Sequence, residues 1–158
     1  MQTRLTIRAI QANDYADWRP LWDGYNAFYG RADETALAEN ITASTWQRFL
    51  NPAEPVHALV ACDDSGIIGL VHFIYHRSTT RLNDVCYLQD LYTAENKRGL
   101  GVARALIEAV YAEAAKANCS RVYWQTQNSN HTARQLYDKL AKHGGFIVYA
   151  REINLAQQ

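Results

Sequence analysis

Apolar residues recur along the chain with two different periods, and these periods predict its helices and strands. Leu5 and Ile7 alternate with polar neighbours, which indicates a first strand. After it, large apolar residues at helical spacing predict a first helix, and these are Trp18, Leu21, Trp22, Tyr25 and Phe28. A second helical stretch, in one or two pieces, is expected over residues 33–50 and is stopped by Pro52.

The middle of the chain is rich in apolar runs of strand length. Residues 56–62 and 67–75 are separated by a short turn that ends in Gly66, which predicts a hairpin. After a third run, over residues 85–93, the period changes to that of a helix. The elements expected from there on are a helix over 99–118, a strand over 121–127, a helix over 130–143 and a last strand over 146–153.

This order of elements constrains the fold. A hairpin requires antiparallel pairing, whereas the strand–helix–strand unit over residues 85–127 implies one right-handed parallel crossover. We therefore expect an α/β (α+β) fold with a mixed, mostly antiparallel central sheet and helices on both faces. The length of 158 residues and the absence of a linker-like segment predict a single domain over residues 1–158.

Composition narrows the range of partners. Lys and Arg together number 16, equal to Asp and Glu, so the basic excess typical of nucleic-acid binding is missing. The longest apolar stretch, over residues 66–75, is too short for a membrane span. Cys62, Cys86 and Cys119 are odd in number and widely spaced, which favours free thiols in a reducing compartment. We expect a cytoplasmic protein without nucleic-acid or membrane partners.

A glycine-rich turn precedes the helix expected at residue 99. Gly99 and Gly101 let the backbone approach an anion closely, and the unpaired amides of the first helical turn favour negative charge. Lys97 and Arg98 add cationic donors, so a pyrophosphate cradle is one interpretation. A tight turn without a ligand explains the glycines equally well, but the position at the carboxyl end of a strand favours the cradle. A dinucleotide-binding turn is excluded, because it requires a small residue at the position of Arg104.

Two motifs resemble the signatures of the GNAT superfamily of N-acetyltransferases. Residues 98–103 (RGLGVA) match the R/Q-x-x-G-x-G/A signature, and residues 130–137 (NHTARQLY) look like N-x-x-A-x-x-L-Y. Residues 87–91 (YLQDL) resemble the subgroup of polyamine and fungal histone/polyamine acetyltransferases. The similarity at the level of motifs covers residues 87–146.

The resemblance implies a binding site for acetyl-CoA. It implies that the pyrophosphate is held by the amides of Arg98, Gly99, Leu100, Gly101, Val102 and Ala103. Main-chain groups of Leu91, Tyr92 and Thr93 would pair with the pantetheine arm like an added strand, with the Leu91 N–H polarising the thioester carbonyl. Asn130 and Ala133 would line the other side of the arm. Tyr137 would lie near the sulfur and act as general acid for the departing thiolate.

The general base is less well defined by the sequence. Strict alternation would place Tyr87, Gln89 and Leu91 on one face and Asp90 with Tyr92 on the other, unless a β-bulge turns Asp90 toward the site. Related enzymes often carry Glu or His where Gln89 stands, and glutamine cannot accept the proton. We expect ordered waters leading to Asp90 or to bulk solvent, with Gln89 orienting the substrate. An equally good interpretation is that Asp90 bonds to neighbouring backbone.

The acceptor is expected to bind among aromatic residues. Tyr25 and Tyr29, with Phe28 and Trp46 nearby, could surround an ammonium by cation–π contact, and each could instead be a core residue. Tyr87 and Gln89 complete the expected substrate contacts. His72 and His76 lack further ligands at metal spacing, so no metal is expected. A homodimer is plausible from the resemblance alone.

The sequence thus predicts an acetyl-CoA-dependent N-acetyltransferase. Its acceptor would be the primary amine of a small molecule, such as a polyamine or an amino acid, which attacks the thioester directly. The alternatives are an enzyme that acetylates protein lysines or N-termini, and an acetyl-CoA-binding sensor without catalysis.

Overall fold

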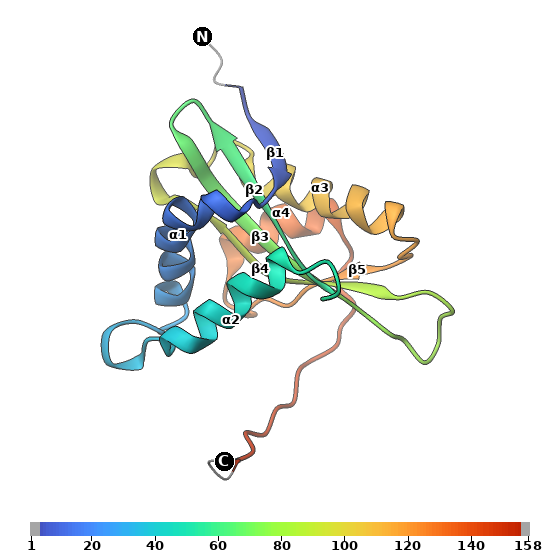
Figure 1. Ribbon diagram of the computed structural model, residues 1–158. Helices are drawn as coiled ribbons and strands as arrows, with labels where there is room; N and C mark the ends of the chain where they lie inside the picture. Colours follow the sequence, from blue (N-terminus) through green and yellow to red (C-terminus); the bar gives the residue numbers. More distant parts are fainter. Residues whose placement is uncertain (1–3, 156–158) are drawn as a thin grey trace. The chain divides into compact units, whose positions relative to one another are not determined.

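A five-stranded sheet, with its strands in sequence order, is the centre of the fold (Figure 1). Its strands are β1 Thr6–Ala9, β2 Val56–Asp63, β3 Gly66–His76, β4 Val85–Thr93 and β5 Val122–Tyr123. The first four strands pair antiparallel, and β5 runs parallel to β4. The mixed, mostly antiparallel sheet expected from the sequence is therefore confirmed.

The computed structural model describes residues 4–155 and divides the chain into two compact units, residues 1–125 and 126–158. The first unit holds the sheet with α1 Tyr15–Phe28, α2 Glu39–Leu50 and α3 Val102–Lys116. Short 3₁₀ turns lie at Ala12–Asp14, Asp33–Thr35 and Glu95–Lys97. The second unit holds α4 His131–Leu140.

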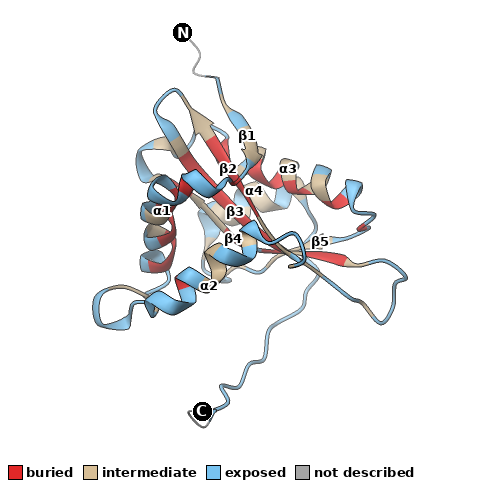
Figure 2. Ribbon diagram, in the orientation of Figure 1, coloured by how far each residue is buried: buried red, intermediate tan, exposed pale blue. Residues whose placement is uncertain are grey.

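Helices cover both faces of the sheet in the first unit. On one face, α1 buries Trp18, Trp22 and Tyr25 against a core that includes Val60 of β2 and Leu70 of β3. On the other face, Gly69 of β3 leaves room for side chains of α3, since a Cβ there would lie 2.9 Å from Val102 and 3.2 Å from Leu106. Buried residues accordingly run along the middle strands and the facing sides of α1 and α3 (Figure 2).

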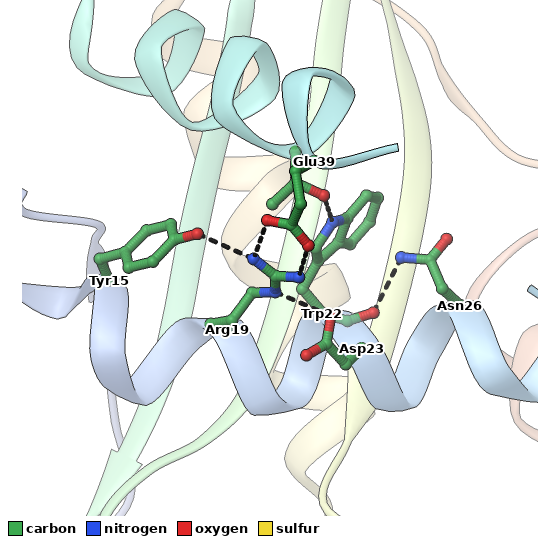
Figure 3. A network of polar contacts seen from close by, with 7 residues as sticks. Tyr15, Arg19, Trp22, Asp23, Asn26 and Glu39 are labelled. Atoms are coloured by element: carbon green, nitrogen blue, oxygen red, sulfur yellow. Dashed lines mark hydrogen bonds and ion pairs between the residues drawn. The ribbon is translucent and has the colours of Figure 1, made fainter. Parts of the chain in front are cut away.

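Polar contacts join α1 to α2 on the outside of this core (Figure 3). Arg19 donates hydrogen bonds to Asp23 (2.8 Å) on α1 and to Glu39 (2.9 Å) on α2. On the inner side, the Trp22 indole donates to Thr42 Oγ1 over 3.1 Å. The expected helical stretch over residues 33–50 forms in two pieces, because Ala36 and Ala38 take extended backbone conformations between them.

One expected strand is missing and another is short. Residues 146–155 form no strand in the described part of the chain and are exposed, with Phe146 and Tyr149 each 89% accessible. Alternation alone cannot make a strand, because its N–H and C=O groups need a partner strand. The strand predicted over residues 121–127 is limited to Val122–Tyr123 for the same reason, since pairing with β4 ends there.

Candidate functional site

The outer edge of β4 is unpaired over most of its length. β5 pairs with β4 only at Cys86 and Tyr87, and no other described strand lies along the remaining edge. Leu91, Tyr92 and Thr93 therefore lie on a stretch of β4 that can accept an extended ligand as an additional strand. Thr93 Oγ1 is also buried without a hydrogen-bond partner among the described residues.

The glycine turn follows directly after this edge. Gly99 and Gly101 have φ angles of 77° and 81°, in the left-handed region that favours glycine. Gly101 is the N-cap of α3, and no side chain caps this helix end. The space in which a Cβ would stand at either glycine is open to at least 4 Å. An uncapped helix start with an open approach fits the expected diphosphate.

The two basic residues before the turn have other partners. Lys97 Nζ forms an ion pair with Asp63 Oδ2 over 2.6 Å, which ties the segment to the end of β2. This bond, with two further bonds from Ser65, lowers the pKa of Asp63 to about 2. Arg98 Nε donates to the Thr93 carbonyl over 3.3 Å, and its guanidinium lies 5.5 Å from the centre of the Tyr92 ring. Lys97 thus positions the turn, and its charge is already compensated.

A β-bulge at Gln89 changes which side chains of β4 share a face. Tyr87 pairs with Ile74 and Asp90 with His72, so the pairing passes over Gln89, and the register shifts at this point. Residues 72 and 74 are two apart in β3 and point to the same face, which places Tyr87 and Asp90 together on the α1 side. The expected alternation, with Asp90 opposite Tyr87, is therefore wrong.

Asp90 is buried in a hydrogen-bonded chain with two aromatic residues. Trp18 Nε1 donates to His72 Nε2 over 3.0 Å, and His72 Nδ1 lies 2.9 Å from Asp90 Oδ2. Because the indole can only donate, His72 Nε2 must accept, so its ring proton is on Nδ1 and points at the carboxylate. Asp90 is 8% exposed and His72 is 3% exposed. The expectation that Asp90 bonds only to backbone does not hold.

Tyrosines from the end of α1 lie close to Asp90. The Tyr25 hydroxyl is 3.5 Å from the Gln89 carbonyl oxygen, at the bulge. Burial, followed by the nearby charge of Asp90, raises the pKa of Tyr25, so its hydroxyl stays protonated at neutral pH. Burial and Asp90 also raise the pKa of Tyr29, while Arg31 opposes this shift. Burial, followed by Asp90, raises the pKa of Tyr87 as well, so three of the expected substrate contacts lie within electrostatic reach of the same carboxylate.

The other two aromatic residues named for the acceptor are placed differently. Trp46 packs against Trp18 and Tyr15, with ring centres 5.0 Å and 5.1 Å apart, between α1 and α2. Phe28 is 60% exposed at the end of α1. Arg31, which the sequence analysis did not identify, lies over the rings of both Tyr25 and Tyr29. An arginine three residues after the aromatic end of α1 was the only signal for it.

The second signature lies in the other unit. Asn130 is the N-cap of α4, and its side-chain amide donates to Thr126 Oγ1 over 3.1 Å. Ala133 and Tyr137 are four residues apart on α4, so they share one face of this helix, and both are half-buried.

Some other classes of site find no support in residues 4–155. No group of three or more His, Cys, Asp or Glu side chains there is arranged to hold a metal ion. No helix in this range has the length and apolar character of a membrane span. All three cysteines are free thiols.

Similarity to known proteins was found at the levels of family, sequence and fold. Residues 18–141 match the family described as Acetyltransferase (GNAT) family. The D-amino-acid N-acetyltransferase HPA3 of Saccharomyces cerevisiae is 33% identical over 150 residues, which cover 94% of this chain and 91% of that protein. The ribosomal-protein-alanine N-acetyltransferase from Brucella melitensis has a similar fold, with a TM-score of 0.74, 19% identity and coverage of 95% and 100%. The structure of AAC(6')-Iy with a CoA bisubstrate analogue has a TM-score of 0.78 at 16% identity, with coverage of 96% and 99%.

Proposed function

Because this chain belongs to the GNAT family of acetyltransferases, we propose that it acetylates the primary amine of a small molecule, such as an amino acid or a polyamine. As a member of this family it is an acyltransferase, and its acetyl donor is acetyl-CoA. We further propose which acceptor it uses and what its individual residues do. The 33% identity to a D-amino-acid N-acetyltransferase supports a small acceptor.

Binding of the donor would use the start of α3 and the edge of β4. The amides of residues 98–103 would hold the pyrophosphate at the uncapped helix end. Main-chain groups of residues 91–93 would pair with the pantetheine arm, and the Leu91 N–H would polarise the thioester carbonyl. When bound, the thioester supplies an activated acetyl group. From the second signature, Asn130 and Ala133 would contribute to the same arm.

Proton transfer would be divided between Asp90 and Tyr137. An amine with an ordinary pKa near 10.4 is almost fully protonated at pH 7, and its deprotonation costs roughly 4.6 kcal/mol. Asp90 would attract the ammonium and receive its proton, directly or through water, while His72 holds the carboxylate in place. Tyr137 would return a proton to the departing thiolate. Gln89 would orient the acceptor from the bulge.

The observation that carries the proposal is the uncapped N-terminus of α3 directly after the unpaired edge of β4. Its test is a thiol-release assay with acetyl-CoA and a panel of acceptors: amino acids, spermidine and lysine-containing peptides. Release with small amines alone is the expected result. Release only with peptides would support a protein acetyltransferase instead. Binding of acetyl-CoA without release on any acceptor would support a sensor and contradict the proposal.

The proposal also covers the subgroup of the family, the cellular location and the oligomeric state of the protein. We place the chain in the subgroup of polyamine and fungal histone/polyamine acetyltransferases, supported by residues 87–91 and by the similarity to the yeast enzyme. The free thiols support a cytoplasmic location. The family match crosses the boundary between the two units, which supports one catalytic domain over residues 1–158. A homodimer would be tested by analytical ultracentrifugation.

A further inference from the structure

We propose that Arg31 binds a carboxylate of the acceptor, so that the substrate is a zwitterionic α-amino acid and not a polyamine. This inference rests on the proposed function and assigns the acceptor class. Three features support it: the contacts that fix the Arg31 side chain, the lack of a carboxylate partner among residues 4–155, and the charge of Asp90, which acts on the same tyrosines.

The guanidinium of Arg31 is fixed by a buried amide. Arg31 Nε donates to Asn26 Oδ1 over 2.7 Å. Asn26 is 4% exposed and is itself anchored, since its Nδ2 donates to the Trp22 carbonyl over 2.9 Å (Figure 3). The main-chain N–H of Arg31 also donates to the Asn26 carbonyl over 2.9 Å. A side chain held in this way loses little further conformational freedom when it binds a ligand.

The same guanidinium lies over two neighbouring tyrosine rings. Its carbon lies 5.8 Å from the centre of the Tyr25 ring and 5.7 Å from that of the Tyr29 ring, within cation–π range. These are the rings that were expected to receive the ammonium of an acceptor. Arg31 already provides their cation, which removes the main reason to place a polyamine there.

Arg31 has no carboxylate partner among residues 4–155. Some arginines of the first unit do have one: Arg8 pairs with Asp14, and Arg19 pairs with Asp23 and Glu39. The two terminal nitrogens of Arg31 have no hydrogen-bond partner in the same part of the chain, although the side chain is half-buried. Neither nitrogen belongs to the buried polar atoms of this part of the chain that lack a partner, so both remain accessible to an external anion. The planar fork of a guanidinium matches a carboxylate in bidentate fashion.

A negative charge acts on the same two tyrosines as this cation. Tyr25 and Tyr29 are each within electrostatic reach of both Asp90 and Arg31. Tyr25 also contacts the main chain at the bulge, directly before Asp90. An α-amino acid carries an ammonium for Asp90 and a carboxylate for Arg31 on the same α-carbon. A polyamine would bring a second positive charge toward Arg31, which opposes its binding.

The test compares acceptors that differ only in the carboxylate. Thiol release would be measured for alanine, methionine and phenylalanine in both enantiomers, for their α-amides and for spermidine, with wild type, Arg31→Gln and Arg31→Lys. The wild type is expected to prefer the free acids. Arg31→Gln should lower kcat/KM for the acids about 10- to 100-fold, as expected for the loss of a charged hydrogen bond, and for the amides far less. Arg31→Lys should restore part of the loss.

Control and contrary outcomes separate this inference from the proposed function. Arg48→Gln, at an exposed position of α2, is the matched control and should leave the preference for acids unchanged. Equal losses on acids and amides in Arg31→Gln, or a wild type that prefers spermidine or the amides, would overturn this inference alone. Absence of thiol release with every acceptor would overturn the proposed function, and this inference with it.

Discussion

His72 and Asp90 face each other across the pair of β3 and β4, joined by a 2.9 Å hydrogen bond between the imidazole Nδ1 and the carboxylate Oδ2. The bond forms where the register shifts at Gln89, so the bulge brings Asp90 to the α1 side. Trp18 fixes the other ring nitrogen. A buried carboxylate is thus held in one orientation beside the tyrosines of the proposed acceptor site.

Replacement of Asp90 by Asn tests its proposed role as proton acceptor. Asn keeps a carbonyl oxygen for the His72 N–H but cannot take a proton from the amine. We expect kcat/KM to fall by about 10²-fold or more, with little change in the melting temperature. Steady-state kinetics and thermal unfolding measure the two effects. Asp64→Asn, in the exposed β2–β3 turn, is the control, and an unchanged rate in Asp90→Asn would exclude the residue from catalysis.

Replacement of Trp18 by Phe tests the hydrogen-bonded chain. The variant leaves His72 Nε2 buried without a donor, which costs about 1–3 kcal/mol in addition to lost packing. Urea unfolding gives the difference in the free energy of unfolding. Trp46→Phe removes an equal volume, but this indole N–H has no hydrogen-bond partner among the described residues. Similar losses in the two variants would show that the bond between Trp18 and His72 is not significant.

The glycine turn can be tested with paired substitutions. Gly101→Ala and Gly66→Ala both place a side chain at a positive φ, at 81° and 115°, so each should lose about 1–2 kcal/mol of stability. Only Gly101→Ala adds a methyl group in the proposed diphosphate cradle. We expect calorimetry to show weaker CoA binding for Gly101→Ala and not for Gly66→Ala. Equal affinities would contradict the assignment of the cradle.

Tyr137 is the proposed general acid, and its hydroxyl can be removed alone. Tyr137→Phe should lower kcat by about 10²-fold, because the thiolate must then take its proton from water. CoA affinity should change little, which calorimetry can check. Tyr149→Phe, at an exposed position of the same unit, is the matched control. A kcat equal to wild type would remove Tyr137 from the chemistry.

The ion pair between Lys97 and Asp63 predicts a change of stability with pH. The folded state lowers the pKa of Asp63 from 3.8 to about 2, so the pair stabilises the fold above pH 4 and loses this effect as the pH falls toward 2. Lys97→Met should therefore unfold at lower urea concentration than wild type at pH 7. The difference should shrink between pH 4 and 2. A constant difference over this range would show that Asp63 is not the group responsible.

The helices and long strands were predictable because their residues repeat a single period. The α3 pattern, for example, buries Leu106, Ile107, Val110 and Ala114, as its spacing indicates. The bulge was not predictable in the same way, since alternation has no signal for one additional residue. The sequence indicated only that Asp90 would need a β-bulge to point toward the site, and β4 contains this bulge.

Residues that act through distant partners were the hardest to predict. Arg31 becomes notable only when it is seen with Tyr25, Tyr29 and Asn26 and without an acid. His72 was considered only as a metal ligand, because Trp18 is 54 positions away in sequence. Residues 146–153 show the opposite error: their alternating pattern predicted a strand, but no described strand pairs with them.

The two faces of the sheet separate the features proposed for donor and acceptor. Val102 and Leu106 anchor the glycine-turn helix against Gly69 on one face, while Asp90 lies under α1 on the other. Arg31 lies in the loop after α1, where substitutions disturb few packed residues. During evolution, substitutions after α1 can therefore change the acceptor that such a protein uses, while its binding of the acetyl donor stays the same.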